Sequence, residues 1–293
     1  MKRKIIPGTI PTADLHQDLL GSVAPRPIAF VSTMDAQGRT NLAPYSFFNA
    51  FSSNPPILVF SSNRRVEGNT TKDTLHNIME SKECVVNVVN YEIVRQMMIC
   101  SVDFPTEISE FEQSGLTPVP AELVKCPLVK ESPVNMECVV QEIIPLGDQG
   151  GAGHLIICKV VCMHVSESIL DENSRIDPQK IDLMGRMGRA FYVRASGKSV
   201  LAMPQSQHLP IVGYPNLPEH IRLSTILTAN DIAYLAGLKT LPDPKTALDE
   251  LLNEVDFNKA FQDNDRKTSI HKLAKHYFEI GNSEKAAKIL ACI

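Results

Sequence analysis

The chain has 293 residues, 43% of them hydrophobic, and a formal net charge of -4 at pH 7. This length accommodates one large β domain with an appendage or two domains, and the charge provides no basic excess of the kind that nucleic acids require. The sequence contains no run of 18 apolar residues, so it predicts no membrane-spanning helix. The basic residues near the start are not followed by the apolar segment of a secretory signal. We therefore expect a cytoplasmic globular protein that binds neither nucleic acid nor a membrane.

The seven cysteines are odd in number, form no Cys-x-x-Cys pair and lie partly in apolar, strand-like runs. Cysteine behaves there as a small hydrophobic residue. His154, His164 and the cysteines show none of the common metal-ligand spacings. We expect a reducing environment, with neither a disulfide framework nor a metal site.

The first two-thirds of the chain carries the signals of a β domain. Runs of β-branched and apolar residues, flanked by Pro, Gly, Asn and Ser, predict strands at residues 28–33, 57–62, 84–89, 136–144 and 155–165. Short amphipathic patterns predict helices at 73–80 and 91–100. Because long helices do not alternate with the strands, the pattern favours a mainly β fold, an antiparallel barrel with flanking helices, over a doubly wound sheet.

The last third of the chain predicts helices. Prolines at 204, 210, 215 and 218 mark a linker-like stretch, and helical patterns then cover residues 219–228, 231–238, 246–255 and 269–293. We place a β domain at 1–203 and a C-terminal α-helical extension at 204–293. The final pattern resembles one tetratricopeptide-type hairpin that turns at Gly281 and Asn282. One such unit cannot bury its own face, so we expect it to pack on the barrel or on a second subunit.

The stretch from Pro25 to Asn49 departs from the alternation of a purely structural hairpin. Its return segment carries Asn41, Ser46 and Asn49 where Val, Ile or Thr would suit a strand better. This composition indicates backbone and short polar side chains that are open to a flat ligand with polar edges.

A second polar stretch combines a strand end with a helix start. Hydroxyl and guanidinium groups at residues 61–65 precede Thr70 to Thr74, which open the helix predicted at 73–80. Free N–H groups, Lys72 and the hydroxyls would suit a phosphate monoester. For the helix start alone, a cap made by Thr71 or Asp73 beside solvated arginines is the better interpretation. Together with the preceding strand end, the pattern favours anion binding.

Other motifs leave alternatives open or are absent. His154 follows a glycine-rich turn and opens a strand, so it either points into a pocket or is a structural histidine, which is the more common case. The segment from Gly185 to Tyr192 is equally compatible with a clamp for phosphate or carboxylate, made by Arg186 and Arg189, and with a surface turn. No Gly-x-Gly-x-x-Gly follows a strand, so the sequence does not predict a Rossmann dinucleotide site.

Taken together, these residues resemble the flavin reductase-like family of FMN-binding split-barrel proteins. The matching segments, within about residues 15 to 200, are 25–29, 32–33, 41–49, 53–56, 72–74, 77–78 and 153–154. The resemblance implies a six-stranded antiparallel Greek-key split barrel with flanking helices. It also implies a homodimer with two FMN sites near the subunit interface.

The resemblance also implies the site residues. The isoalloxazine and ribityl chain would be lined by Ser32, Thr33, Asn41, Leu42, Ala43, Tyr45 and Ser46. The phosphate would be held by Ser61, Ser62, Arg65, Lys72 and Thr74. His154 matches the histidine of the family's Gly-Asp-His segment, close to flavin and nicotinamide, and would be the catalytic residue that orients them. The aspartate position of that segment is Gly153 here.

The activity that the resemblance implies is that of an NAD(P)H:flavin oxidoreductase, which transfers hydride from the nicotinamide to flavin N5 on bound FMN, with FAD as an alternative cofactor. Electrons would then pass to an external flavin, a ferric complex or a partner monooxygenase. An FMN-binding electron-transfer or carrier protein without its own NAD(P)H activity is the alternative, with the helical tail recruiting a partner. The sequence does not distinguish NADH from NADPH.

Overall fold

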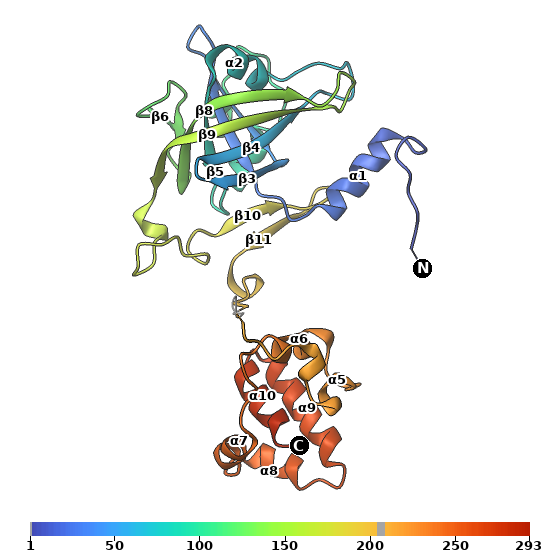
Figure 1. The fold of residues 1–293 in the computed structure, drawn as a ribbon. Coiled ribbons are helices and arrows are strands. Elements are labelled where there is room, and N and C mark those ends of the chain that lie inside the picture. The colour runs from blue at the N-terminus through green and yellow to red at the C-terminus, as the bar shows by residue number, and fades with distance from the viewer. Residues whose placement is uncertain (1, 204–208) are drawn as a thin grey trace. The chain divides into compact units, whose positions relative to one another are not determined.

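The computed structural model describes residues 2–203 and 209–293, and the chain divides into two compact units, Met1–Leu201 and Ala202–Ile293. Figure 1 draws the first unit in blue to yellow and the second in orange to red. Residue 204, at which we began the helical extension, lies outside the described residues. Among the residues that are described, no helix is long and apolar enough to cross a membrane.

The first unit is built on a seven-stranded antiparallel sheet with the order β2-β1-β5-β8-β9-β4-β3. Its strands are β1 (Ala29–Met34), β2 (Thr40–Tyr45), β3 (Phe48–Ser53), β4 (Pro56–Asn63), β5 (Glu83–Val88), β8 (Val134–Pro145) and β9 (Gly153–Val165). Each of the five predicted runs lies on one of these strands. The mainly β antiparallel class predicted from the sequence is confirmed.

The sheet closes into a barrel at the corner between β2 and β3. These strands are separated only by Ser46 and Phe47, yet they lie at opposite edges of the sheet. The Ser61 N–H on β4 donates to the Phe47 carbonyl at 2.8 Å and joins the corner to the far edge. The sheet has seven strands where the resemblance implied six, because this corner divides one extended segment into the two strands β2 and β3. The corner also explains why this segment does not alternate like a hairpin.

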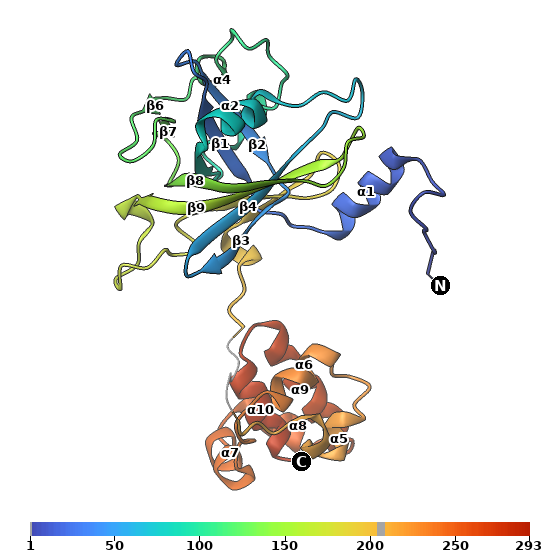
Figure 2. The ribbon, with the colours of Figure 1, turned by 45° about the horizontal axis from the view of Figure 1, so that its top comes forward.

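The barrel interior is an apolar core that one helix covers. Buried side chains of β1, β4, β5, β8 and β9 fill the interior. Helix α2 (Asp73–Ser81) adds the fully buried Leu75 and Ile78 to this core and lies over one end of the barrel (Figure 2). Burial of each of these two side chains contributes about 1.5–3 kcal/mol. The first turn of α2 is thereby held against β1 and β2.

Shorter elements flank the barrel. They are α1 (Thr12–Ser22), α3 (Val94–Ile99), α4 (Glu110–Ser114), the pairs β6 (Pro118–Val119) with β7 (Leu128–Val129) and β10 (Leu183–Arg186) with β11 (Tyr192–Ala195), and the 3-10 turns η1 (Glu167–Ile169) and η2 (Gly197–Ser199). The helix predicted at 91–100 is shorter than expected. Its first residues form a turn in which the Tyr91 N–H donates to the Asp182 carbonyl at 3.0 Å.

The second unit is helical and has a core of its own. It contains η3 (Tyr214–Asn216), α5 (Glu219–Arg222), α6 (Ala229–Ala236), α7 (Pro244–Leu251), α8 (Val255–Phe261), α9 (Arg266–Glu279) and α10 (Ser283–Ala291). The hairpin of α9 and α10 turns at Gly281, as predicted. Its buried alanines pack with Phe257, Leu251 and Leu235 of the same unit. The expectation that this face needs the barrel or a second subunit is therefore wrong, because α6, α7 and α8 cover it.

The helix expected at 219–228 ends at Arg222 because a serine competes with the helix. The Ser224 hydroxyl accepts from the N–H groups of Ile226 and Leu227 at 3.2 and 3.1 Å, which favours a turn. The same hydroxyl lies 2.8 Å from Nδ1 of the buried His271. Nε2 of His271 is 3.2 Å from Nδ1 of His220. Burial, followed by the neighbouring His220, lowers the pKa of His271 to about 4.

Candidate functional site

The residues proposed to line a flavin divide between the two faces of β1 and β2. Side chains alternate along a strand. Ala43 and Tyr45 pack with the core of the barrel interior, and Thr33 shares the face of the interior residue Val31 on β1. Leu42 packs into a different cluster and lies on the opposite face. Only part of a contiguous sequence motif can therefore face one ligand.

Ser32 and Leu42 already have partners within the chain. The buried Ser32 hydroxyl donates to the Pro127 carbonyl and accepts from the Asn87 amide at 3.5 Å. The Leu42 N–H donates to Oε2 of Glu110 at 3.0 Å. These contacts fasten the walls of the barrel to the loops outside it. The Ser32 hydroxyl and the Leu42 N–H, which were predicted to line the flavin, are therefore already engaged within the chain.

An amide network joins β1, β2 and the first turn of α2. Nδ2 of Asn41 donates to the Thr74 hydroxyl at 2.8 Å and to the Thr33 hydroxyl at 3.3 Å. Nδ2 of the buried Asn77 donates to the same Thr33 hydroxyl at 3.1 Å. Three of the predicted residues are thus brought together, and Asn77 joins them although the sequence-based set did not include it. Its signal was its place one helical turn after Thr74.

Two buried hydroxyls near this network have no hydrogen-bond partner. Among the described residues, the side-chain polar atoms in this state are Oη of Tyr45 and Oγ of Ser62. Burial raises the pKa of Tyr45 to about 12, and the nearby hydroxyls of Thr74 and Ser62 and the charge of Arg65 oppose the shift. Buried polar groups are nearly always satisfied, so an unpaired pair indicates a site for a further polar group.

Lys72 brings a positive charge close to the Tyr45 ring and the start of α2. Its Nζ lies 5.5 Å from the centre of the Tyr45 ring. Burial lowers the pKa of the Lys72 ammonium, and the negative charge of Asp103 opposes this shift. Within the described part of the chain, Lys72 forms no ion pair. A partly buried cation without a salt bridge is a favourable partner for an anion.

The helix start does not use the cap that the sequence favoured for it. Lys72 occupies the N-cap position of α2, and no side chain there accepts a hydrogen bond from the first turn. The Thr71 hydroxyl instead contacts Nε2 of His76, and the Asp73 carboxylate accepts from the Thr106 hydroxyl at 3.0 Å. The capping interpretation is therefore wrong, and the N-terminal end of α2 remains open to an acceptor.

Arg65 organises the loop that leads to α2. Its guanidinium forms an ion pair with Asp103 at 2.9 Å and donates to the Thr71 carbonyl at 2.9 Å. The hydrogen bonds to Asp103 raise the pKa of Arg65. Arg65 therefore lies next to the start of α2, as predicted for the anion site, but the Asp103 carboxylate already neutralises its charge.

His154 lies at the mouth of β9, opposite Ser62 in the sheet register. Its ring is buried, and Nδ1 lies 3.3 Å from the Ser62 carbonyl oxygen, which suits the tautomer protonated at Nδ1. The preceding Gly153 has no room for the family's aspartate. A Cβ there would lie 2.4 Å from the Ser61 hydroxyl, which donates to Oδ1 of Asn63 at 2.9 Å. The Ser62 carbonyl is thus the group that orients the His154 ring.

Arg26 braces the corner between β2 and β3, a role that the sequence analysis did not assign. Its guanidinium donates to the carbonyls of Leu20, Val23 and Met187. Nε lies 3.4 Å from the Ser46 hydroxyl, and the guanidinium carbon is 5.9 Å from the centre of the Phe47 ring. Burial, together with the charge of Arg186, lowers the pKa of Arg26. A cation between two prolines in an apolar run was the available signal.

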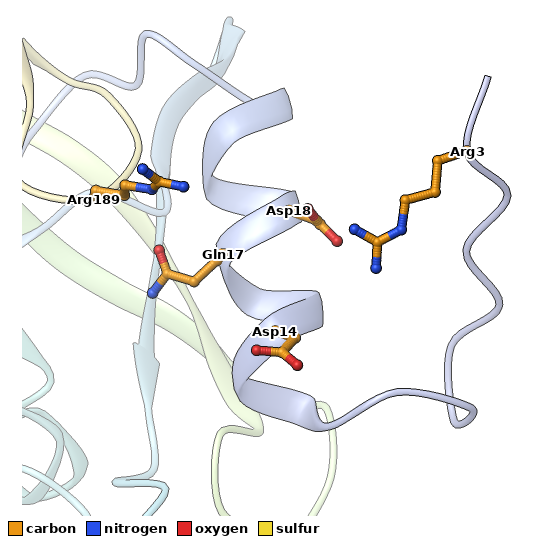
Figure 3. Close-up of a pocket in the computed structure, with 5 residues that line it drawn as sticks. All are labelled: Arg3, Asp14, Gln17, Asp18 and Arg189. Carbon is orange, nitrogen blue, oxygen red and sulfur yellow. The ribbon is translucent and has the colours of Figure 1, made fainter. Parts of the chain in front are cut away.

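The segment from Gly185 to Tyr192 forms a hairpin, with the Arg186 guanidinium carbon 4.6 Å from the centre of the Tyr192 ring. Arg189 at its tip lines a surface cavity of about 570 Å³. Figure 3 shows Asp18 of α1 pointing toward Arg3, with Gln17 on the side of Arg189. None of the predicted flavin residues lines this cavity.

The first unit thus combines an antiparallel barrel with a helix start that carries Lys72 and has no side-chain cap. The flavin reductase like domain family matches residues 20–180, more than half of the chain. The chain therefore belongs to the flavin reductase-like family. The match ends before the second unit.

Relatives and solved structures agree with this assignment. An uncharacterized protein of Aquifex aeolicus is 41% identical over 187 residues, which cover 64% of this chain and 93% of the relative. Nitrilotriacetate monooxygenase component B from Bacillus cereus is 33% identical with a TM-score of 0.64, covering 69% of this chain and 99% of that one. The 2-nitrobenzoate 2-nitroreductase of Pseudomonas fluorescens is 31% identical with a TM-score of 0.61, covering 72% and 100%.

Proposed function

We propose that this protein binds FMN at the corner between β2, β4 and α2 and reduces it with NADH or NADPH. The observation that carries the proposal is the unpaired pair of buried hydroxyls, Tyr45 and Ser62, beside the Lys72 ammonium and the uncapped start of α2. A phosphate monoester supplies acceptor oxygens for each of these donors. The residues at this corner therefore fit the phosphate end of FMN.

The ring of the flavin would lie along β2 and the corner that follows it. Strand β2 is at an edge of the sheet, where it pairs with β1. Main-chain groups near Ala43 and Ser46 would contact the polar edge of the ring, while Arg26 holds the corner in place. Bound FMN would accept hydride from the nicotinamide and pass electrons on. Asn41 would hold β2 against α2 through its hydrogen bond to Thr74. His154, oriented by the Ser62 carbonyl, would position the flavin and nicotinamide rings.

The electron acceptor that we propose is based on two of the similar solved structures. One structure with 33% identity is named as a monooxygenase component and one with 31% identity as a nitroreductase. We propose that the reduced flavin serves either a partner monooxygenase or a small oxidised substrate. An FMN carrier without NAD(P)H activity is the competing function.

A homodimer is proposed from the exposed edge strand β3. Residues 49–53 of this strand are exposed, and the Phe51 side chain is 68% exposed on it. An edge strand with an exposed aromatic side chain is normally covered, because its unpaired backbone groups can bind another strand. Strand β3 directly follows the corner that holds Ser46, so a second copy on this edge would lie next to the flavin ring. Light scattering of Phe51→Asp against wild type tests this proposal: wild type should be dimeric and the variant should dissociate.

We propose residues 1–203 as the flavin domain and 204–293 as a helical extension with its own stability. The second unit has its own buried core, and the family match lies entirely before it. A chain that ends at residue 203 should therefore fold and bind FMN as the full-length protein does.

Anaerobic mixing of the FMN-loaded protein with NADH and, separately, with NADPH tests the activity. Loss of the oxidised flavin absorbance within seconds, with one nucleotide preferred, would support the reductase. Flavin that remains oxidised with both nucleotides but is reduced by dithionite would establish the carrier function instead.

A further inference from the structure

Glutamate, cysteine and histidine side chains meet on β8 and β9, on the face turned away from the barrel interior. Glu137 pairs with Cys162 across the two strands, and His164 lies two residues further along β9. Because side chains on a strand repeat every two residues, Cys162 and His164 project from the same face. Glu137 is fully buried there, whereas Cys162 and His164 are partly exposed.

The three side chains bring their ligand-type atoms to one place. Nε2 of His164 lies 2.7 Å from Oε1 of Glu137 and 3.6 Å from Sγ of Cys162. The three atoms all lie within 4.8 Å of one another. A nucleophilic relay of Cys, His and Glu would require the two ring nitrogens to face different partners. Here both partners face the same nitrogen, which is the geometry of a ligand set.

The backbone of a neighbouring loop fixes the carboxylate of Glu137. Its Oε1 accepts from the Glu122 N–H at 3.0 Å, and its Oε2 accepts from the N–H groups of Leu123 and Val124 at 2.6 and 3.1 Å. Hydrogen bonds of this kind orient the ligands of a metal and are part of most such sites. A carboxylate so held is available at a fixed position without further ordering.

We propose that Glu137, Cys162 and His164 bind one divalent transition metal ion, with zinc as the metal that best suits this donor set. Tetrahedral zinc with ordinary bond lengths separates a thiolate sulfur from an imidazole nitrogen by about 3.6 Å, and that nitrogen from a carboxylate oxygen by about 3.3 Å. The separation of sulfur and nitrogen already fits. The nitrogen and oxygen must move apart by about 0.6 Å as their hydrogen bond is replaced by two bonds to the metal.

The surroundings favour a cation that arrives from solvent. The carboxylates of Glu137 and Glu122 both lie close enough to the Cys162 thiol to give its surroundings a negative potential. The same negative potential attracts a metal ion, which then displaces the thiol proton. Since Cys162 and His164 are partly exposed, the fourth position faces solvent and would hold water, as in zinc sites with three protein ligands.

A simple ion pair between Glu137 and His164 that fastens the loop of residues 122–124 is the competing explanation. Cys162 has no role in that ion pair, so a test of its thiol distinguishes the ion pair from the metal site. The sequence showed no ligand spacing because two ligands come from β9 and the third from β8, which only the sheet register brings opposite them.

The test uses the full-length protein, stripped of metal with a chelator and titrated with Co²⁺ and then with Zn²⁺. Absorption spectra report the thiolate-to-cobalt charge-transfer band in the near ultraviolet and the visible bands of tetrahedral cobalt. The variants are Cys162→Ser and His164→Gln, and the matched control is Cys292→Ser, which alters a free cysteine of the helical unit. Thermal melting of each variant without metal reports whether it folds.

Wild type and Cys292→Ser should bind one Co²⁺ per chain with the charge-transfer band, and Zn²⁺ should displace it. Cys162→Ser should lose the band, and both site variants should bind at least about tenfold more weakly. The proposal is overturned if wild type shows no charge-transfer band with excess Co²⁺. It is also overturned if the band persists in Cys162→Ser, a result that does not depend on His164→Gln being folded.

Discussion

Replacing Lys72 by Met should show how much the phosphate of FMN contributes to binding, apart from the rest of the flavin. Methionine keeps most of the apolar length of the lysine side chain and removes the ammonium, whose Nζ is 5.5 Å from the centre of the Tyr45 ring. A hydrogen bond to a charged group contributes about 1.5–3 kcal/mol, so FMN should bind about 10- to 150-fold more weakly. Riboflavin, which lacks the phosphate, should bind wild type and variant alike.

The same substitution should not harm the protein without FMN. Burial lowers the pKa of Lys72, which means that the folded protein disfavours the charge. The melting temperature of the unliganded variant should therefore be equal to or above that of wild type. Binding is measured by quenching of flavin fluorescence with FMN and with riboflavin. The control is Lys82→Met, which removes an exposed lysine just after α2. An equal loss of affinity for FMN and riboflavin, or no loss for either, would refute a phosphate site at Lys72.

Three further substitutions probe other parts of the structure. Tyr45→Phe removes a buried hydroxyl without a partner, so the free energy of unfolding in urea should rise by about 1–3 kcal/mol while FMN affinity falls; a loss of stability would contradict the geometry. Gly153→Ala places a Cβ 2.4 Å from Oγ of Ser61 and should cost about 1–3 kcal/mol, and Ser61→Ala in the same chain should recover part of that cost in a double-mutant cycle. His271, with its pKa lowered from 6.5 to about 4, stays neutral when folded while the unfolded chain takes up a proton. The free energy of unfolding of the helical unit should thus be highest above pH 6.5 and fall by roughly 3 kcal/mol as the pH drops to 4. His271→Gln should make this free energy less dependent on pH, measured by urea unfolding followed by circular dichroism at 222 nm.

The strands, and the polar residues that gather around the start of α2, could be predicted because their signals are local. Runs of β-branched residues between turn formers marked five strands, and the hydroxyl, lysine and helix-start signals between Ser61 and Thr74 all lie within one short segment. A pattern of this kind depends on neighbours along the chain, which the sequence states directly.

The division of the flavin residues could not be predicted from adjacency. Ser32 and Thr33 are neighbours in the sequence, but the pleat sends them to opposite faces, and Pro127 and Asn87 take the Ser32 hydroxyl. Those partners come from distant loops and strands. Their approach depends on how the barrel closes, which no local pattern records.

The helical unit shows the same limit. The turn at Gly281 was predicted because glycine tolerates its φ of +81°. The end of α5 at Arg222 was not, since it depends on the Ser224 hydroxyl meeting the backbone of the next turn and His271. Helix α8 was missed because its first residue, Val255, also ended the preceding apolar pattern.

Co-elution of FMN with the full-length protein tests the central claim most directly. The purified protein is incubated with FMN, separated from free flavin by gel filtration, and its visible spectrum is recorded alongside the Lys72→Met variant. The account predicts one FMN per chain with wild type and much less with the variant. Absence of flavin from the wild-type peak, together with no rise in melting temperature at high FMN concentration, would contradict it.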